Sequence, residues 1–201
     1  MFRVVVTTSA ATTLNIVTDA NGDYSQVVPV GVTAVRASDL AGFIVTTTNN
    51  PQNVTVAGGA VANAAAIGFA PFATVTGTVW RDLDSDRVRD AGEPGLSGWR
   101  VELVNPATGA VVLSANTTAT GQYTIANVVP ATTYRMRYVA PNGAIFGVGV
   151  NGETGNPQAD ATLNAAQRSI EITPQPGVTL TQQSLPVDPQ GIVYDTVSRQ
   201  P

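Results

Sequence analysis

Short runs of Val, Thr and Ile, separated by Gly, Pro and Asn, recur along almost the whole chain. Branched side chains favour extended backbone, and turn residues at intervals of roughly 8–12 positions keep each strand short. This pattern predicts an all-β protein built as a sandwich, with at most one helical turn at 61–66 and at 163–168. The expected strands are 3–8, 14–18, 43–48, 53–56, 75–80, 99–104, 111–114, 134–139 and 169–173.

The side chains that are absent limit the chemistry open to this chain. The sequence of 201 residues contains no Cys, no His and no Lys. It therefore lacks a thiol nucleophile, an imidazole base and a Schiff-base amine. We expect no enzyme, although two suitably spaced carboxylates could still form a hydrolase. A net charge of −4 with no basic stripe argues against nucleic acid or an anionic membrane as partner, and no apolar run is long enough to span a bilayer.

Two internal similarities suggest how the chain is divided. Residues 18–29 and 118–130 each read as a Gly turn, a Tyr-bearing strand and a Val-Val-Pro turn. Residues 77–80, Gly-Thr-Val-Trp, resemble 191–194, Gly-Ile-Val-Tyr. The sequence thus predicts tandem sandwich modules: 1–73 lacking its own first strand, a complete domain over 74–187, and a linker with a spare C-terminal strand over 188–201.

One loop carries most of the candidate chemistry. Residues 82–93 place acidic side chains at positions 1, 3, 5, 9 and 12, which is the ligand spacing of a twelve-residue calcium loop. Oxygen ligands in a loop favour Ca²⁺, and the position-7 residue offers a backbone carbonyl. The predicted metal ligands are Asp82, Asp84, Asp86, Val88, Asp90 and Glu93.

Two features separate this loop from an EF-hand. Arg87 occupies position 6, where an EF-hand has Gly for its sharp turn, and no amphipathic helices flank the loop. The competing interpretation is a solvated acidic loop in which Arg87 and Arg89 act as partial counter-ions.

The same segment carries a family resemblance. Residues 77–86 and 90–103 resemble the opening of a B-type repeat from Gram-positive serine–aspartate-repeat adhesins, and 118–130 resembles its closing hairpin. The resemblance implies a prealbumin-like or immunoglobulin-like β-sandwich, an extracellular location at the cell surface, and a Ca²⁺ ion that stiffens the module. Related collagen-adhesin B-type modules often carry a Lys–Asn isopeptide cross-link, which a chain without Lys cannot form.

Together these features predict an extracellular structural protein, a calcium-stabilised module of a bacterial surface fibre or adhesin stalk. Residues 190–201 could complete the 1–73 domain of the next molecule by β-strand addition, giving a head-to-tail homopolymer. The alternative is a fragment of a longer adhesin array that binds a glycan or a protein. That alternative needs exposed aromatics, but Phe146 is the only one in the 142–168 loop, and Trp80 and Trp99 lie in strands with core-like alternation.

Overall fold

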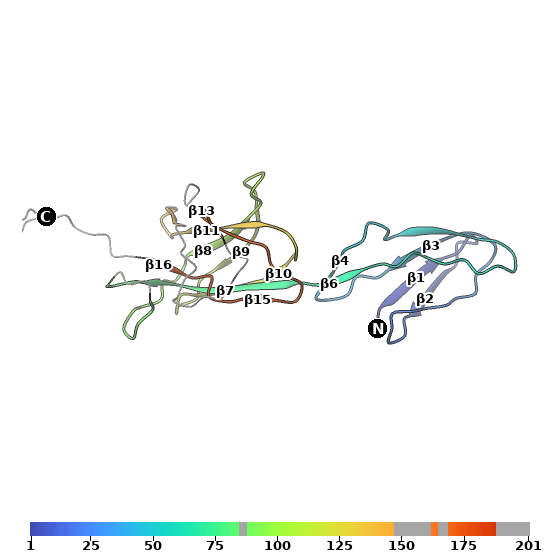
Figure 1. Cartoon of the computed structure of the whole chain (residues 1–201), viewed down its shortest axis with the longest axis horizontal. Helices are drawn as coiled ribbons and strands as arrows, with labels where there is room; N and C mark the ends of the chain where they lie inside the picture. The colour runs from blue at the N-terminus through green and yellow to red at the C-terminus, as the bar shows by residue number, and fades with distance from the viewer. Residues whose placement is uncertain (85–87, 147–161, 165–168, 188–201) are drawn as a thin grey trace, which may run out of the picture. The chain divides into compact units, whose positions relative to one another are not determined.

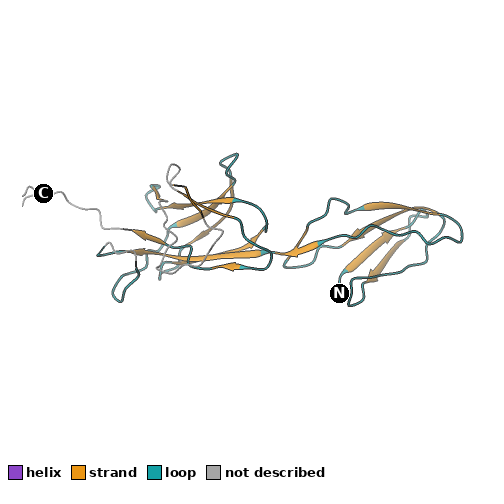
Figure 2. Ribbon diagram, viewed as in Figure 1, coloured by secondary structure: helices purple, strands orange, loops and turns teal. Residues whose placement is uncertain are grey.

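The computed structural model describes residues 1–84, 88–146, 162–164 and 169–187, and none of these residues is helical (Figure 2). The chain divides into two compact units, Met1–Pro71 (unit 1) and Phe72–Pro201 (unit 2). The prediction of an all-β sandwich protein is confirmed.

Unit 1 is built around one antiparallel sheet with the order β2-β1-β3-β5. Its small core consists of Val4 and Val6 from β1 and Val35 from β3. Alternate residues of β1 are buried because successive side chains of a strand point to opposite faces. A separate pair, β4 and β6, forms a second small sheet, and β6 ends at the boundary with unit 2 in sequence. The strands are β1 (Arg3–Thr7), β2 (Thr13–Val17), β3 (Gly31–Ala37), β4 (Phe43–Val45), β5 (Gln52–Val56) and β6 (Phe69–Pro71).

Unit 2 contains two sheets. One has the order β10-β7-β15, with β16 also paired to β7, and the other has the order β13-β14-β11-β8-β9, with β12 paired to β11 (Figure 1). The strands are β7 (Ala73–Arg81), β8 (Arg100–Val104), β9 (Val111–Asn116), β10 (Gln122–Val128), β11 (Tyr134–Val139), β12 (Ile145–Phe146), β13 (Thr162–Asn164), β14 (Ser169–Ile172), β15 (Thr179–Leu180) and β16 (Leu185–Val187).

The core of unit 2 lies between these two sheets. Both sheets contribute fully buried side chains to a single cluster, including Val75 and Val79 from β7, Leu103 from β8 and Met136 from β11. Burying the inner faces of two sheets against each other is the arrangement that defines a β-sandwich.

Strand β7 is the central strand of its sheet. It pairs antiparallel with β10 on one side and parallel with β15 and β16 on the other. Between β15 and β16 the chain stays attached to β7, because the Gln183 N–H donates to the Thr76 carbonyl over 3.0 Å. The Ser184 hydroxyl accepts the Thr78 N–H over 3.1 Å.

Strand β16 was not expected from the sequence. Residues 186–189, Pro-Val-Asp-Pro, read as a stiff joint, whereas the structure pairs Leu185–Val187 with the end of β7. A three-residue strand containing Pro has no periodic signal, and among the described strands β16 pairs only with β7, which is an edge position where Pro is tolerated.

The structure describes the residues around the first predicted domain boundary but not those of the predicted C-terminal segment. The two compact units meet after Pro71, close to the predicted division at 73/74. The predicted linker and donor strand at 188–201 lie outside the described residues. Among the described residues no helix is long and apolar enough to cross a membrane.

Candidate metal centre

The acidic loop begins where β7 ends and returns to the same strand. The Arg81 N–H donates to the Pro94 carbonyl over 2.9 Å, and the Leu96 N–H donates to the Val79 carbonyl over 2.8 Å. Trp80 forms a β-bridge with Gly95 between these two bonds. The start and the end of the loop are therefore held beside each other.

This closure gathers three of the predicted ligands. One carboxylate oxygen each from Asp82, Asp84 and Glu93 lies within 4.8 Å of the other two. Asp82 and Glu93 are buried, whereas Asp84 is exposed, so the group has a side that faces solvent. Three carboxylates this close repel one another unless a cation lies between them, and an all-oxygen set suits a hard cation such as Ca²⁺.

Glu93 is oriented by the loop backbone. Its Oε1 accepts the Leu83 N–H over 2.6 Å and its Oε2 accepts the Asp90 N–H over 3.0 Å. These two backbone hydrogen bonds, with a smaller contribution from the nearby Arg89 charge, lower the pKa of the Glu93 carboxyl. Glu93 is therefore ionised at neutral pH, and each oxygen keeps a second lone pair that can face a metal ion.

The other predicted ligands are placed differently. Asp90 is exposed and contributes its backbone N–H to Glu93, and its carboxylate is not among the three gathered oxygens. Val88 is half-buried. Asp86, like Arg87, lies outside the described residues. The full ligand set remains a prediction.

Sequence reasoning missed how tightly the loop is joined to its surroundings. The Asp82 N–H donates to the Val187 carbonyl of β16 over 3.1 Å. A Cβ on Gly95 would lie 1.9 Å from the Thr120 carbonyl oxygen, so the end of the loop packs directly on the turn before β10. Only the Gly at position 95 could have signalled this close approach, and a single Gly is a weak signal.

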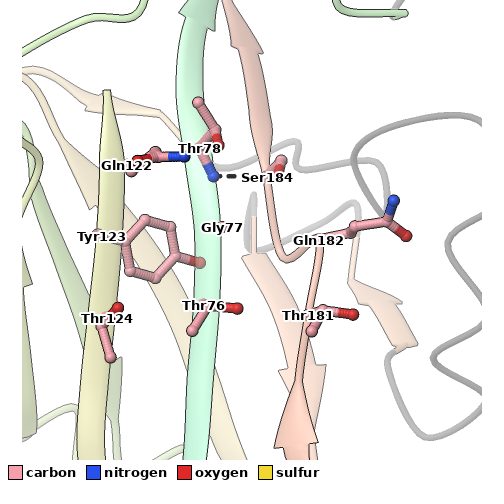
Figure 3. Close-up of a pocket in the computed structure, with 9 residues that line it drawn as sticks. All are labelled: Thr76, Gly77, Thr78, Gln122, Tyr123, Thr124, Thr181, Gln182 and Ser184. Carbon is pink, nitrogen blue, oxygen red and sulfur yellow. Dashed lines mark hydrogen bonds between the residues drawn. The ribbon is translucent and has the colours of Figure 1, made fainter. Parts of the chain in front are cut away.

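A polar pocket of about 370 Å³ lies on the outer side of β7 and β10 (Figure 3). It has no Asp, Glu or Arg among its described lining residues, so it offers hydroxyl and amide groups but no charge. Those residues are Thr76, Gly77, Thr78, Gln122, Tyr123, Thr124, Thr181, Gln182 and Ser184.

Three aromatic side chains of unit 2 that could have formed a ligand-binding surface pack inside the domain instead. Trp80 and Trp99 are buried, as their strand positions predicted. Phe146, the aromatic on which a ligand-binding loop would depend, packs against Trp99 with ring centroids 5.0 Å apart.

Comparison with known proteins identifies the family. Residues 73–184 match the SdrD B-like domain, so the chain belongs to the SdrD B-like domain family. This confirms the resemblance to adhesin B-type repeats. The family indicates a structural repeat of the kind found in surface adhesins.

Two similar proteins can be named. Colossin-A of Dictyostelium discoideum is 28% identical over 79 residues, which is 39% of this chain, and the chain spans 1% of the length of Colossin-A. The structure of the Bacillus anthracis TIE protein aligns with 93% of this chain and 30% of its own, at 12% identity and a TM-score of 0.37.

Proposed function

We propose that this chain is a calcium-stabilised structural module of an extracellular fibre or adhesin stalk on a bacterial surface. The observation that supports the ion most directly is the group of Asp82, Asp84 and Glu93 at the end of the central strand. Ca²⁺ bound there would neutralise three carboxylates and hold the loop closed against β7. It would act as a stiffening element and would take no part in any reaction.

The contacts of Asp82 indicate what the ion would hold together. Its side chain belongs to the acidic group, and its backbone binds Val187, the last residue of β16. An ordered loop would therefore also hold the end of β16 in place.

Thermal unfolding with and without calcium tests the metal site. At a free Ca²⁺ concentration of a hundred times Kd, binding should stabilise the folded state by about 2.7 kcal/mol, which raises the melting temperature of a domain of this size by about 10 °C. The Glu93→Gln variant should lose most of this shift. Asp39→Asn, at an exposed carboxylate in unit 1, should keep it. A melting temperature that does not respond to EGTA would sink the calcium proposal.

The second part of the proposal concerns assembly. Residues 190–201 would donate a strand to the 1–73 domain of the next molecule, and repetition of this contact would give a head-to-tail filament. The similarity of 191–194 to the β7 residues 77–80 supports it.

Electron microscopy of the purified protein in calcium is the test of assembly. We expect filaments from the complete chain and single particles from a variant that lacks 190–201. Equal filament formation by the truncated variant would refute strand donation. Single particles from both would instead favour the alternative of a repeat that belongs to a longer adhesin array.

A further inference from the structure

The main sheets of the two units have the same topology. In chain order, β1, β2, β3 and β5 of unit 1 form the sheet β2-β1-β3-β5, and β8, β9, β11 and β14 of unit 2 form the corresponding sheet β9-β8-β11-β14. Every pairing in both sets is antiparallel. Unit 1 is therefore built on the same plan as unit 2 in this layer.

The second layer differs between the units. In unit 2 the chain leaves β9, turns, and forms β10, which pairs with β7. In unit 1 the chain leaves β2 and enters the similar segment 23–29, yet this segment is not a strand. Within residues 1–71, all of which the structure describes, no strand pairs with 23–29. The position that β7 holds in unit 2 has no counterpart in those residues.

The side chains of this segment reflect the difference. Tyr123 and Val128 of β10 are 3% and 0% exposed. The corresponding Tyr24 still packs on the core of unit 1 but is only half-buried. Val27, which corresponds to Val128 in the shared Val-Val-Pro, is 90% exposed. The segment thus presents an unpaired backbone edge with exposed apolar side chains.

The pairing of β7 with β10 shows what such a strand must look like. Gly77 lies opposite Tyr123, and a Cβ on Gly77 would lie 2.9 Å from the Tyr123 ring (Figure 3). A strand in this place therefore needs Gly opposite the Tyr. It also needs an apolar residue two positions later, where Val79 is fully buried. Residues 191–194 meet both requirements with Gly191 and Val193.

We infer that residues 21–25, which include the start of this segment, accept a strand and that residues 190–194 of a second copy of this chain pair with them antiparallel, in the register that sets Gly191 opposite Tyr24. This inference rests on the proposed assembly and specifies its binding site. In this register Ser25 lies opposite Gln190, as Thr124 lies opposite Thr76 in unit 2.

The reach of the chain favours a second copy over the same molecule. Strand β16 runs parallel to β7 and ends beside Arg81, eight residues from the start of β7. At about 3.3 Å per residue, that is ~26 Å from the connection to unit 1, whereas residues 188–190 span only ~10 Å. To take up its own donor, unit 1 would have to fold back along the whole of β7.

Disulfide trapping tests the register directly, because the natural chain contains no Cys. The Ser25→Cys and Gln190→Cys variants are prepared separately, mixed in calcium and oxidised. Opposed residues in a strand pair have Cα separations that a disulfide can bridge. We expect a covalent heterodimer on a non-reducing gel. The matched control replaces Gln190→Cys with Ile192→Cys, which should cross-link much less because it lies two residues out of register.

The outcomes separate this inference from the proposed assembly. Suppose that filaments are seen by microscopy but Ser25→Cys cross-links preferentially to Ile192→Cys, or does not cross-link at all. Either result would overturn the register and leave the proposed assembly standing. The double variant Ser25→Cys/Gln190→Cys should form a ladder of covalent oligomers. A circularised monomer from that variant would show that the donor comes from the same chain. A complete chain that forms no filaments and no cross-link would overturn both proposals.

Discussion

At the scale of single residues, Gly77 is one of the positions with the least room for a larger side chain. A Cβ there would lie 2.1 Å from the backbone oxygen of Gln183, which cannot move without disturbing the β15–β16 connection. We expect Gly77→Ala to lower the free energy of unfolding of unit 2 by about 3 kcal/mol, at the upper end of overpacking costs.

Urea unfolding of a matched variant distinguishes this clash from backbone strain. Gly109 has a φ of +73° and no atom near its would-be Cβ. Gly109→Ala should therefore cost only about 1 kcal/mol, the penalty for a left-handed Ala. Equal losses of unfolding free energy in the two variants would mean that the clash with Gln183 does not determine the cost of Gly77→Ala.

Glu102 is a second residue whose surroundings make a clear prediction. It is 1% exposed, and its carboxylate binds Arg137 over 2.6 Å and Arg100 over 2.7 Å. Glu102→Ala should lower the free energy of unfolding by about 3 kcal/mol, because it leaves the partly buried Arg137 without its anion. Arg36→Ala, which removes an exposed ion pair with Asp39, should cost less than about 1 kcal/mol in the same urea titration. A loss at Glu102 no larger than at Arg36 would contradict the importance of burial.

At the scale of elements, tyrosine hydroxyls from two strands bind the segment that connects β15 to β16. Tyr123 of β10 and Tyr138 of β11 both donate to the Gln183 carbonyl, the second over 2.8 Å. Burial raises the pKa of both hydroxyls well above the ordinary value of 10. Because the folded state holds these protons more tightly than the unfolded chain, their contribution to stability is complete below pH 10 and is lost as the pH rises further.

Alkaline titration tests this arrangement. Absorbance at 295 nm should show that Tyr123 and Tyr138 ionise only together with unfolding, while the stability measured in urea falls above pH 10. The double variant Tyr123→Phe/Tyr138→Phe should lose part of this pH dependence. Free ionisation of all five tyrosines near pH 10 in the folded protein would contradict it.

The same scale shows how far the sequence could predict the fold. Strands with clear apolar alternation were predicted to within a residue or two, as for β1 and β11. The short strands β15 and β16 were missed because they depend on parallel pairing with β7, which leaves no local pattern. The strand β3 was also missed, because Thr33 and Arg36 interrupt its apolar alternation and because its first residue, Gly31, reads as a turn residue.

The candidate metal centre was also predictable only in part, because the sequence shows local spacing but not the fold of the loop. Acidic spacing identified Asp82, Asp84 and Glu93, which the structure brings together. The same spacing also included Asp90, whose role in the structure is that of a backbone donor to Glu93. Spacing reports which residues are near one another in the chain, but it does not report which atom of each turns inward.

At the scale of the whole molecule, the two units differ in how much apolar surface they bury. Among the residues that the structure describes, the buried core cluster of unit 1 has three members, whereas that of unit 2 has sixteen. We therefore expect two transitions in calorimetry, with unit 1 unfolding first. Calcium should raise only the upper transition. Glu102→Ala should lower that same transition, which assigns it to unit 2. A single transition that moves as a whole would show that the units unfold together.

The parallel ladder of β7 with β15 and β16 has one further consequence, for a chain under tension. Strand β7 begins at Ala73, near the start of unit 2, and β16, the last described strand, ends beside the far end of β7. A force applied to the two ends would slide these strands along each other. Their hydrogen bonds would then have to rupture together, in shear, instead of opening one at a time as in an unzipping hairpin. The bond from Asp82 to Val187 lies at the end of this ladder, so an ion in the acidic loop would reinforce the ladder at the end where β16 finishes.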